Sequence, residues 1–262
     1  MSVFTDIPSI GLGTYTNNTK DGIYSALDYA MSEKYPMIDT AELYKNHQFI
    51  GDYFSENDDK RKNVWITTKL SFRTIEKGLT KMKESMEKMY SDFNIDKIDL
   101  VLIHAPTKNN KDAWELLRQY QEDGKINRVG ISNFNVDNLQ KFISEIGPEE
   151  VEKIYCNQIE ANPFLNRPDL YKLCKNNGIK MIAYGSLYKE NEFIQQLASR
   201  LGVTAKQVLL KWAQQTGFSV IPFATEPSHI KENINLDFQI PEEDFQVLNT
   251  FDEGFSKYKR FL

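Results

Sequence analysis

Residues that build cross-links and metal centres are scarce in this sequence. It has only two cysteines, Cys156 and Cys174, without a Cys-x-x-Cys pattern, and three histidines, His47, His104 and His229, at unrelated positions. Two thiols without that spacing indicate buried, reduced cysteines rather than a disulfide framework or a zinc site. A metal-dependent hydrolase needs clustered histidines and carboxylates, so we expect no metal and place His47 on a helix surface.

Long apolar runs and clusters of basic residues are missing as well. No apolar segment approaches the roughly 20 residues that span a bilayer, and the first residues show no basic stretch followed by an apolar one. The 32 Lys and Arg residues are scattered and the formal net charge is −5, which argues against a nucleic-acid-binding surface. We therefore expect a cytoplasmic monomer that acts on a small molecule and binds neither nucleic acid nor membranes.

Short apolar segments alternate with longer segments of helical periodicity along the whole chain. The strand candidates are rich in β-branched and aromatic residues, as strands are, and apolar residues three or four positions apart follow each of them. The charged segment 55–63 is expected to be a solvated loop. The eight strand candidates lie at 10–13, 37–39, 64–68, 98–103, 129–131, 153–159, 180–184 and 218–222.

Strands that are apolar almost throughout indicate burial on both faces, which is typical of a parallel sheet. Eight such units in 262 residues predict a (β/α)₈ TIM barrel that forms one domain over residues 1–262. An open doubly wound sheet would carry Gly-x-Gly-x-x-Gly after its first strand. Segment 11–16 reads Gly-Leu-Gly-Thr-Tyr-Thr and lacks the third glycine, which favours the barrel.

Polar side chains gather where the predicted strands end. The carboxyl ends of barrel strands form one rim, and the chemistry of such enzymes is located there. Taken singly, these residues have structural explanations, such as helix caps, packing or a satisfied core histidine; Asp39 and Glu42, for example, could form a capping box. Their occurrence together on one rim favours a functional site. The rim residues are Asp39, Tyr44, Lys69, His104, Ser132, Asn133, Gln158 and Tyr184.

Four of these residues can form an acid site for a carbonyl oxygen. A tyrosine hydroxyl has a pKa of about 10, and a nearby ammonium lowers such a pKa by roughly one to three pH units. Asp39 would hold Lys69 in place beside Tyr44, and His104 would donate a hydrogen bond to the carbonyl oxygen. None of the four is a source of hydride, so a redox reaction here requires a cofactor.

Eight segments, in the same order, resemble the aldo-keto reductases over nearly the whole chain. The resemblance implies a (β/α)₈ barrel that uses NAD(P)H to reduce an aldehyde or ketone to the alcohol. It assigns Asp39, Tyr44, Lys69 and His104 as the catalytic residues, with the hydride from nicotinamide C4 and the proton from Tyr44. The segments are GLGT (11–14), IDTAELYKN (38–46), ITTK (66–69), LIHAP (102–106), GISNF (130–134), NQIE (157–160), IAYGSL (182–187) and IKEN (230–233).

The same resemblance implies the cofactor contacts. Ser132, Asn133 and Gln158 would hold the nicotinamide carboxamide, and Tyr184 would stack on the ring. Segment 185–187 would lie along the pyrophosphate, and the end of segment 230–233 near the adenine. The further cofactor-binding residues that it implies are Gly13, Thr14, Gly185, Ser186, Leu187, Phe223, His229, Glu232 and Asn233.

The sequence departs from the family where the cofactor phosphate is bound. Members that prefer NADPH usually carry Ile-Pro-Lys-Ser and a following arginine, which hold the 2′-phosphate. Here segment 221–224 reads Ile-Pro-Phe-Ala, and His229, mostly neutral near pH 7, replaces the arginine. Charge-assisted contacts to phosphate contribute about 1.5–3 kcal/mol each. NADP(H) is therefore the expected cofactor from family frequency, with NAD(H) an alternative from these residues.

Shortened segments around the rim predict an open cleft. Leu187 is followed almost at once by a helix from residue 190, which leaves no loop to fold over the cofactor. Tyr15 and Ala105, expected to contact the substrate, replace frequent tryptophans and predict a wide, unselective pocket. Few residues precede Gly11, so the hairpin that plugs the barrel bottom in the family is reduced. A cofactor-binding sensor with little turnover is the alternative function, against which the intact catalytic residues argue.

Overall fold

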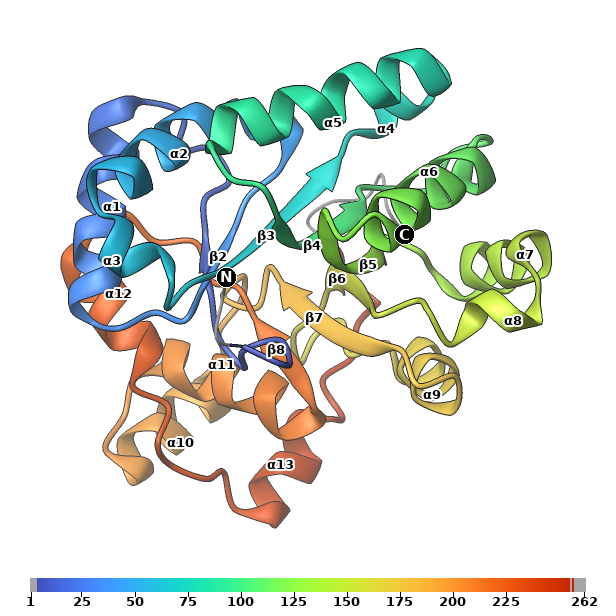
Figure 1. Ribbon diagram of the computed structural model, residues 1–262. Helices are drawn as coiled ribbons and strands as arrows, with labels where there is room; N and C mark the ends of the chain where they lie inside the picture. The colour runs from blue at the N-terminus through green and yellow to red at the C-terminus, as the bar shows by residue number, and fades with distance from the viewer. Residues whose placement is uncertain (1–3, 255, 257–262) are drawn as a thin grey trace.

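The computed structural model describes residues 4–254 and 256, and at its centre lie eight parallel strands (Figure 1). The strands follow one another in chain order, each paired with the next. Parallel neighbours require crossover connections, which helices supply here. The strands are β1 (Leu12–Gly13), β2 (Met37–Asp39), β3 (Trp65–Leu70), β4 (Ile98–Ile103), β5 (Ile126–Ser132), β6 (Cys156–Glu160), β7 (Lys180–Tyr184) and β8 (Phe218–Val220).

The sheet closes into a barrel because the chain after β8 pairs with the chain around β1. The Gly11 amide donates to the Val220 carbonyl at 2.9 Å, and the Gly13 amide donates to the Pro222 carbonyl at 3.0 Å. A Cβ atom at Gly13 would lie 2.7 Å from the Ile221 carbonyl oxygen, so this close approach requires glycine. The predicted (β/α)₈ barrel is confirmed.

Helices surround the strands on the outside of the barrel (Figure 1). Four of them begin at a Thr or Asn whose side chain accepts a hydrogen bond from the first turn, namely Thr19, Asn135, Asn191 and Thr204. Within residues 4–254, no helix is both long and apolar enough to cross a membrane. The helices are α1 (Lys20–Ser32), η1 (Glu42–Tyr44), α2 (His47–Glu56), α3 (Asp58–Arg61), α4 (Phe72–Ile75), α5 (Leu79–Phe93), α6 (Asn110–Glu122), α7 (Val136–Ile146), α8 (Pro148–Val151), α9 (Pro168–Asn176), α10 (Glu192–Leu201), α11 (Ala205–Thr216), α12 (Pro227–Ile234) and α13 (Glu242–Leu248).

The inside of the barrel has an apolar layer below a polar one. Residues two positions apart on a strand point to the same face. Asp39 therefore shares a face with Met37, Lys69 with Trp65, and Gln158 with Cys156, which places all three polar side chains at the carboxyl end. The apolar cluster beneath them contains Met37, Trp65, Leu100, Leu102, Cys156, Ile182 and Ile221.

The amino-terminal segment covers the bottom of this apolar cluster. Phe4 and Ile7 pack against it, and the Asp6 carboxylate bonds with Tyr155 and Lys180. Residues 4–9 form no strand, so the described part of this segment contains no hairpin. The described residues 4–7 therefore cover the barrel bottom without forming a hairpin.

Two local expectations are wrong. Segment 55–63 is not simply a loop, because α3 forms within it; Asp58 at its start and Arg61 at its end complement the helix dipole. His47 is not on the surface but is 5% exposed, with Nε2 2.9 Å from the Thr68 hydroxyl and its ring 4.5 Å from that of Phe93. Burial is possible for this polar ring because the Thr68 hydroxyl supplies a hydrogen-bond partner.

Candidate active site

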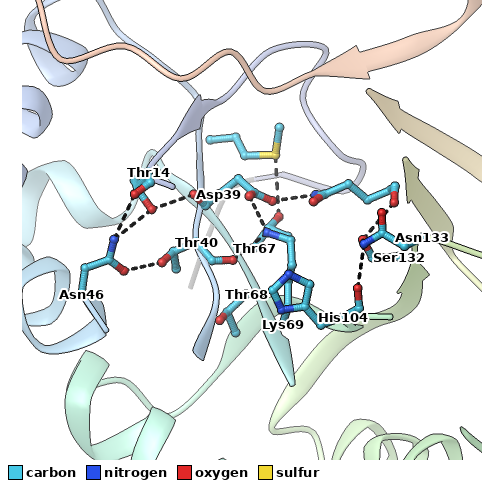
Figure 2. Close-up of polar contacts among 12 residues, drawn as sticks. Thr14, Asp39, Thr40, Asn46, Thr67, Thr68, Lys69, His104, Ser132 and Asn133 are labelled. Atoms are coloured by element: carbon cyan, nitrogen blue, oxygen red, sulfur yellow. Dashed lines mark hydrogen bonds and ion pairs between the residues drawn. The ribbon is translucent and has the colours of Figure 1, made fainter. Parts of the chain in front are cut away.

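The two charged side chains of the polar layer form a buried ion pair (Figure 2). Lys69 Nζ donates to Asp39 Oδ1 at 2.5 Å and to the Thr40 carbonyl oxygen at 2.8 Å. Asp39 Oδ2 accepts a hydrogen bond from Gln158 Nε2 at 2.7 Å. Burial lowers the pKa of Lys69 and raises the pKa of Asp39, while the contact between them opposes both shifts. Three hydrogen bonds therefore fix the position of the Lys69 side chain and its partner.

Tyr44 lies beside this pair, at the end of η1. Lys69 Nζ is 5.2 Å from the centre of the Tyr44 ring. The His104 ring meets the Tyr44 ring edge-on with 6.0 Å between centroids, and the Tyr15 ring lies 5.2 Å from it on another side. The structure thus brings together all four residues that the sequence assigns to catalysis.

A buried amide anchors the loop that carries Tyr44. Asn46 Oδ1 accepts from the Thr40 hydroxyl at 2.5 Å, and Asn46 Nδ2 donates to the carbonyl oxygens of Thr14, at 3.3 Å, and Asn17, at 2.9 Å. These bonds connect the loop after β2 to the loop after β1 (Figure 2). Asn46 therefore restricts where Tyr44 can move.

Glu42 anchors the same loop from its other side. Its carboxylate accepts from the Ser71 amide at 2.7 Å and from the Thr74 hydroxyl at 2.5 Å, both in the region of α4. Glu42 is therefore engaged with the connection after β3, and the structure shows no capping-box bonds between it and Asp39 among the described contacts.

His104 follows β4 and is a neutral ring. Burial, with the charge of Lys69 as a second cause, lowers the pKa of His104 to about 3. Its carbonyl oxygen accepts from Asn133 Nδ2 at 2.8 Å, which connects it to the next strand end. Its Nδ1 atom is buried and has no hydrogen-bond partner in the described part of the chain. A neutral imidazole carries one N–H donor, so His104 can act as a donor but not as a cation.

Four polar residues at the ends of β5, β6 and β7 form one network. The Ser132 hydroxyl and the backbone N–H of Asn133 both donate to the backbone carbonyl oxygen of Gln158 at 2.9 Å. The Tyr184 hydroxyl donates to Asn133 Oδ1 at 2.6 Å. Asn133 has a φ of 64°, in the left-handed region where asparagine is tolerated better than most residues. The four residues expected to contact the nicotinamide are therefore neighbours and already positioned.

The loop after β1 forms the adjoining part of the rim. The Thr14 amide and hydroxyl both donate to the Asp39 carbonyl oxygen at 3.0 Å, next to Gly13 at the end of β1. Tyr15 is 49% exposed, whereas Ala105 is buried beside His104. The exposed Tyr15 ring, 5.2 Å from that of Tyr44, thus lies at the mouth of the site, and Ala105 is buried next to His104 in the chain.

The chain after β7 turns sharply and reaches α10 within residues 185–191. Gly185 has a φ of 66°, which favours glycine. The buried Ser186 hydroxyl donates to the Ala161 carbonyl at 3.0 Å, and Leu187 packs against the core. The first residues of this connection are therefore bound to the body of the barrel, whereas Tyr188 is exposed.

The residues expected at the adenine end lie after β8 and on α12. Phe223 is 44% exposed. His229 Nε2 lies 3.4 Å from Lys206 Nζ, and the Glu232 carboxylate accepts from the Thr204 hydroxyl.

Asn233, on the same helix, is 1% exposed, and no described residue bonds its Oδ1 atom. A buried amide oxygen without a partner is rare in proteins and fits a ligand that donates a hydrogen bond.

Sequence analysis did not single out three residues of the site. Asn46 and Thr40 belong to the segment that carries Tyr44, but nothing in the sequence shows that their side chains are buried and bonded to each other. Phe72, the first residue of α4, lies with its ring 6.3 Å from that of His104. Phe72 could have been found from its position, because it follows directly after the strand that carries Lys69 and so lies near the rim.

Comparison with known proteins decides the family. The sequence model of the Aldo/keto reductase family matches residues 9–190 and 186–253. This chain belongs to the aldo-keto reductase family. Methylglyoxal reductase DkgB of Escherichia coli O157:H7 is 31% identical to it over 258 residues, which cover 94% of this chain and 93% of that protein. Glyoxal reductase of Bacillus subtilis (strain 168) is 30% identical over 256 residues, covering 95% and 90%.

A solved aldo-keto reductase has the same fold. MGS-M4, from a Medee basin deep-sea metagenome library, superposes with a TM-score of 0.88 at 28% identity, covering 96% of this chain and 93% of that one. As an aldo-keto reductase, the protein is an oxidoreductase that uses a nicotinamide cofactor to reduce carbonyl compounds. The alternative of a sensor with little turnover has no support, because these relatives are named as reductases. In the part of the chain that the structure describes, no group of three His, Cys, Asp or Glu side chains could hold a metal ion.

Proposed function

We propose that this aldo-keto reductase reduces small aldehydes, with Tyr44 as the proton donor. The Asp39–Lys69 pair beside the Tyr44 ring is the observation that supports this most. An ammonium whose Nζ lies 5.2 Å from the ring centre favours the phenolate over the phenol. The Tyr44 hydroxyl is then a stronger acid than a free tyrosine and transfers its proton to the carbonyl oxygen more readily.

His104 and Asp39 assist Tyr44 in different ways. The neutral His104 ring donates a hydrogen bond to the carbonyl oxygen, which stabilises the negative charge that develops there. Asp39 does not contact the substrate and instead holds Lys69 under Tyr44. Gln158 bonds the second oxygen of Asp39 at 2.7 Å and fixes the carboxylate in turn.

A nicotinamide cofactor fits the rim and supplies the hydride, from C4 of its ring, when it is bound. Ser132, Asn133 and Gln158 would bind the carboxamide, and Tyr184 would contact the ring. At the other end, the buried Asn233 Oδ1 atom lacks a donor among the described residues, and an adenine amino group would supply one. The residues present therefore fit a dinucleotide that reaches from Tyr184 to α12.

NADP(H) is the cofactor that we propose, with NAD(H) accepted as well. Phe223 and His229 replace the lysine and arginine that hold the 2′-phosphate in family members that prefer NADPH. Each of these phosphate contacts contributes about 1.5–3 kcal/mol to binding. Their loss therefore reduces the difference in affinity between NADPH and NADH. The short connection 185–191 leaves no long loop over the cofactor, so we expect exchange of bound cofactor to be rapid.

Small 2-oxoaldehydes are the proposed substrate class. Two relatives are named methylglyoxal reductase and glyoxal reductase. The exposed Tyr15 ring and the half-buried Tyr44 ring bring aromatic surface to the mouth, and the small Ala105 leaves room beside His104. Such a mouth accepts compact carbonyl compounds with little selectivity.

The Tyr44→Phe variant tests this function. General acid catalysis contributes about 10²- to 10⁴-fold, so we expect kcat for methylglyoxal to fall by that factor. The dissociation constants for NADPH and NADH, measured by quenching of tryptophan fluorescence, are expected to stay unchanged. Tyr29→Phe, which removes a hydroxyl from an exposed tyrosine on α1, is the matched control, for which an unchanged kcat is expected. Full activity of Tyr44→Phe would exclude Tyr44 as the proton donor.

A cytoplasmic monomer remains part of the proposal. The scattered surface charge, with a net value of −5, favours a soluble protein without a nucleic-acid partner. Gel filtration coupled to light scattering tests the monomer, and a mass twice that of the chain would contradict it.

A further inference from the structure

A cation without a carboxylate partner lies at the start of α11. Lys206 is half-buried, and its Nζ atom lies 3.4 Å from His229 Nε2 on α12. An ammonium can only donate, so in a hydrogen bond between the two side chains Lys206 is the donor and His229 Nε2 is the acceptor. Among the described residues, Lys206 takes part in no ion pair; the nearby Glu232 carboxylate is bonded by the Thr204 hydroxyl instead. Among the described residues, the Lys206 ammonium therefore lies beside a histidine ring and forms no ion pair.

A second observation at the same corner points to a ligand. Asn233 lies four residues after His229 and so on the same face of α12. It is 1% exposed, and its Oδ1 atom has no partner in the described part of the chain. An unpartnered acceptor on α12, and an ammonium of α11 that lies beside His229 of the same α12, match a group that carries both an amino donor and an anion. An adenosine with a phosphate on its ribose has both.

We infer that Lys206 binds the 2′-phosphate of NADP(H) and so determines the cofactor preference of this reductase. This inference rests on the proposed function and refines it. The ammonium of Lys206 comes from α11. The positions where family members carry the usual basic residues are Phe223, after β8, and His229, on α12. His229 orients Lys206 through the 3.4 Å contact instead of binding the phosphate with its own charge. Preference for NADP(H) is thereby kept although the usual basic residues are replaced.

The test compares the affinities of two cofactors that differ only in this phosphate. The full-length protein is titrated with NADPH and with NADH at low ionic strength, and quenching of tryptophan fluorescence gives both dissociation constants without turnover. Lys206→Gln is expected to weaken NADPH binding about tenfold to a hundredfold, the loss of one charge-assisted contact. NADH binding is expected to stay unchanged, and Lys206→Arg is expected to restore NADPH binding.

Lys231→Gln is the matched control. This variant also removes one positive charge, here from α12. Lys231 lies two residues from His229 and therefore does not face the same way. An unchanged ratio of NADPH to NADH affinity in Lys206→Gln would overturn the inference. An equal loss of NADPH affinity in Lys206→Gln and Lys231→Gln would also overturn it, because general attraction would then explain the effect. A wild-type protein that binds neither cofactor would overturn the proposed function itself.

Discussion

The buried pair of Asp39 and Lys69 leads to a prediction about stability that is independent of catalysis. The two side chains are 2% and 1% exposed and 2.5 Å apart. Asp39→Asn keeps the shape of the side chain but leaves the ammonium without a countercharge. Removal of one partner from a buried pair costs about 3–5 kcal/mol. We expect a loss of that size in the free energy of unfolding for Asp39→Asn and for Lys69→Met.

The double variant distinguishes the interaction between Asp39 and Lys69 from the separate contribution of each side chain. With both Asp39→Asn and Lys69→Met, no charge is buried, and such replacements are often close to neutral. The double variant is therefore expected to be more stable than either single variant. Urea denaturation at pH 7, followed by tryptophan fluorescence, measures the free energy of unfolding of the wild-type protein, the two single variants and the double variant. The exposed pair Lys81–Glu84 on α5, also with a short contact of 2.6 Å, is the control, for which a coupling of about 0.2–0.5 kcal/mol is expected.

Additivity of the two single losses would refute this reasoning. It would mean that Asp39 and Lys69 act independently and that burial of one does not depend on the charge of the other.

Two further predictions concern the surroundings of the site. Asn46→Ala removes the hydrogen bonds to the Thr40 hydroxyl and to two carbonyl oxygens, so urea denaturation should show a loss of about 1–3 kcal/mol in the free energy of unfolding. We expect kcat to fall while cofactor affinity is kept. An unchanged kcat would contradict the role of Asn46 in anchoring the loop of Tyr44. His47 has a folded pKa of about 3, below the unfolded value. The stability that it contributes is therefore present above pH 6.5 and lost as the pH falls toward 3, so His47→Gln should reduce the loss of unfolding free energy between pH 6 and 4 by up to about 1.4 kcal/mol per pH unit. Equal pH slopes would show that folding does not lower the pKa of His47.

The sequence predicted the barrel and its rim because both follow from local periodicity. Residues two apart on a strand share a face, so Met37 and Asp39, or Cys156 and Gln158, point inward together. The last inward residues of parallel strands meet at one end of a closed barrel. That rule alone brings Asp39 close to Gln158, 119 residues later in the chain.

Contacts between loops could not be predicted in the same way. His47 starts an amphipathic helix, and its burial depends on the hydroxyl of Thr68 on another element. Asn46 bonds Asn17, 29 residues away, and Lys206 meets His229 across two helices. Each depends on how connections pack after the barrel has formed, and polar residues at such positions look like ordinary surface residues in the sequence.

The pH dependence of kcat in the wild-type protein and in the Asp39→Asn/Lys69→Met variant tests the effect of the ammonium on Tyr44 most directly. Reduction requires the protonated hydroxyl, so activity falls above the pKa of the group that donates the proton. The variant removes the ammonium and its countercharge together, and we expect lower activity with the alkaline fall displaced to higher pH. An alkaline fall at the same pH in both proteins would show that Lys69 does not make Tyr44 a stronger acid.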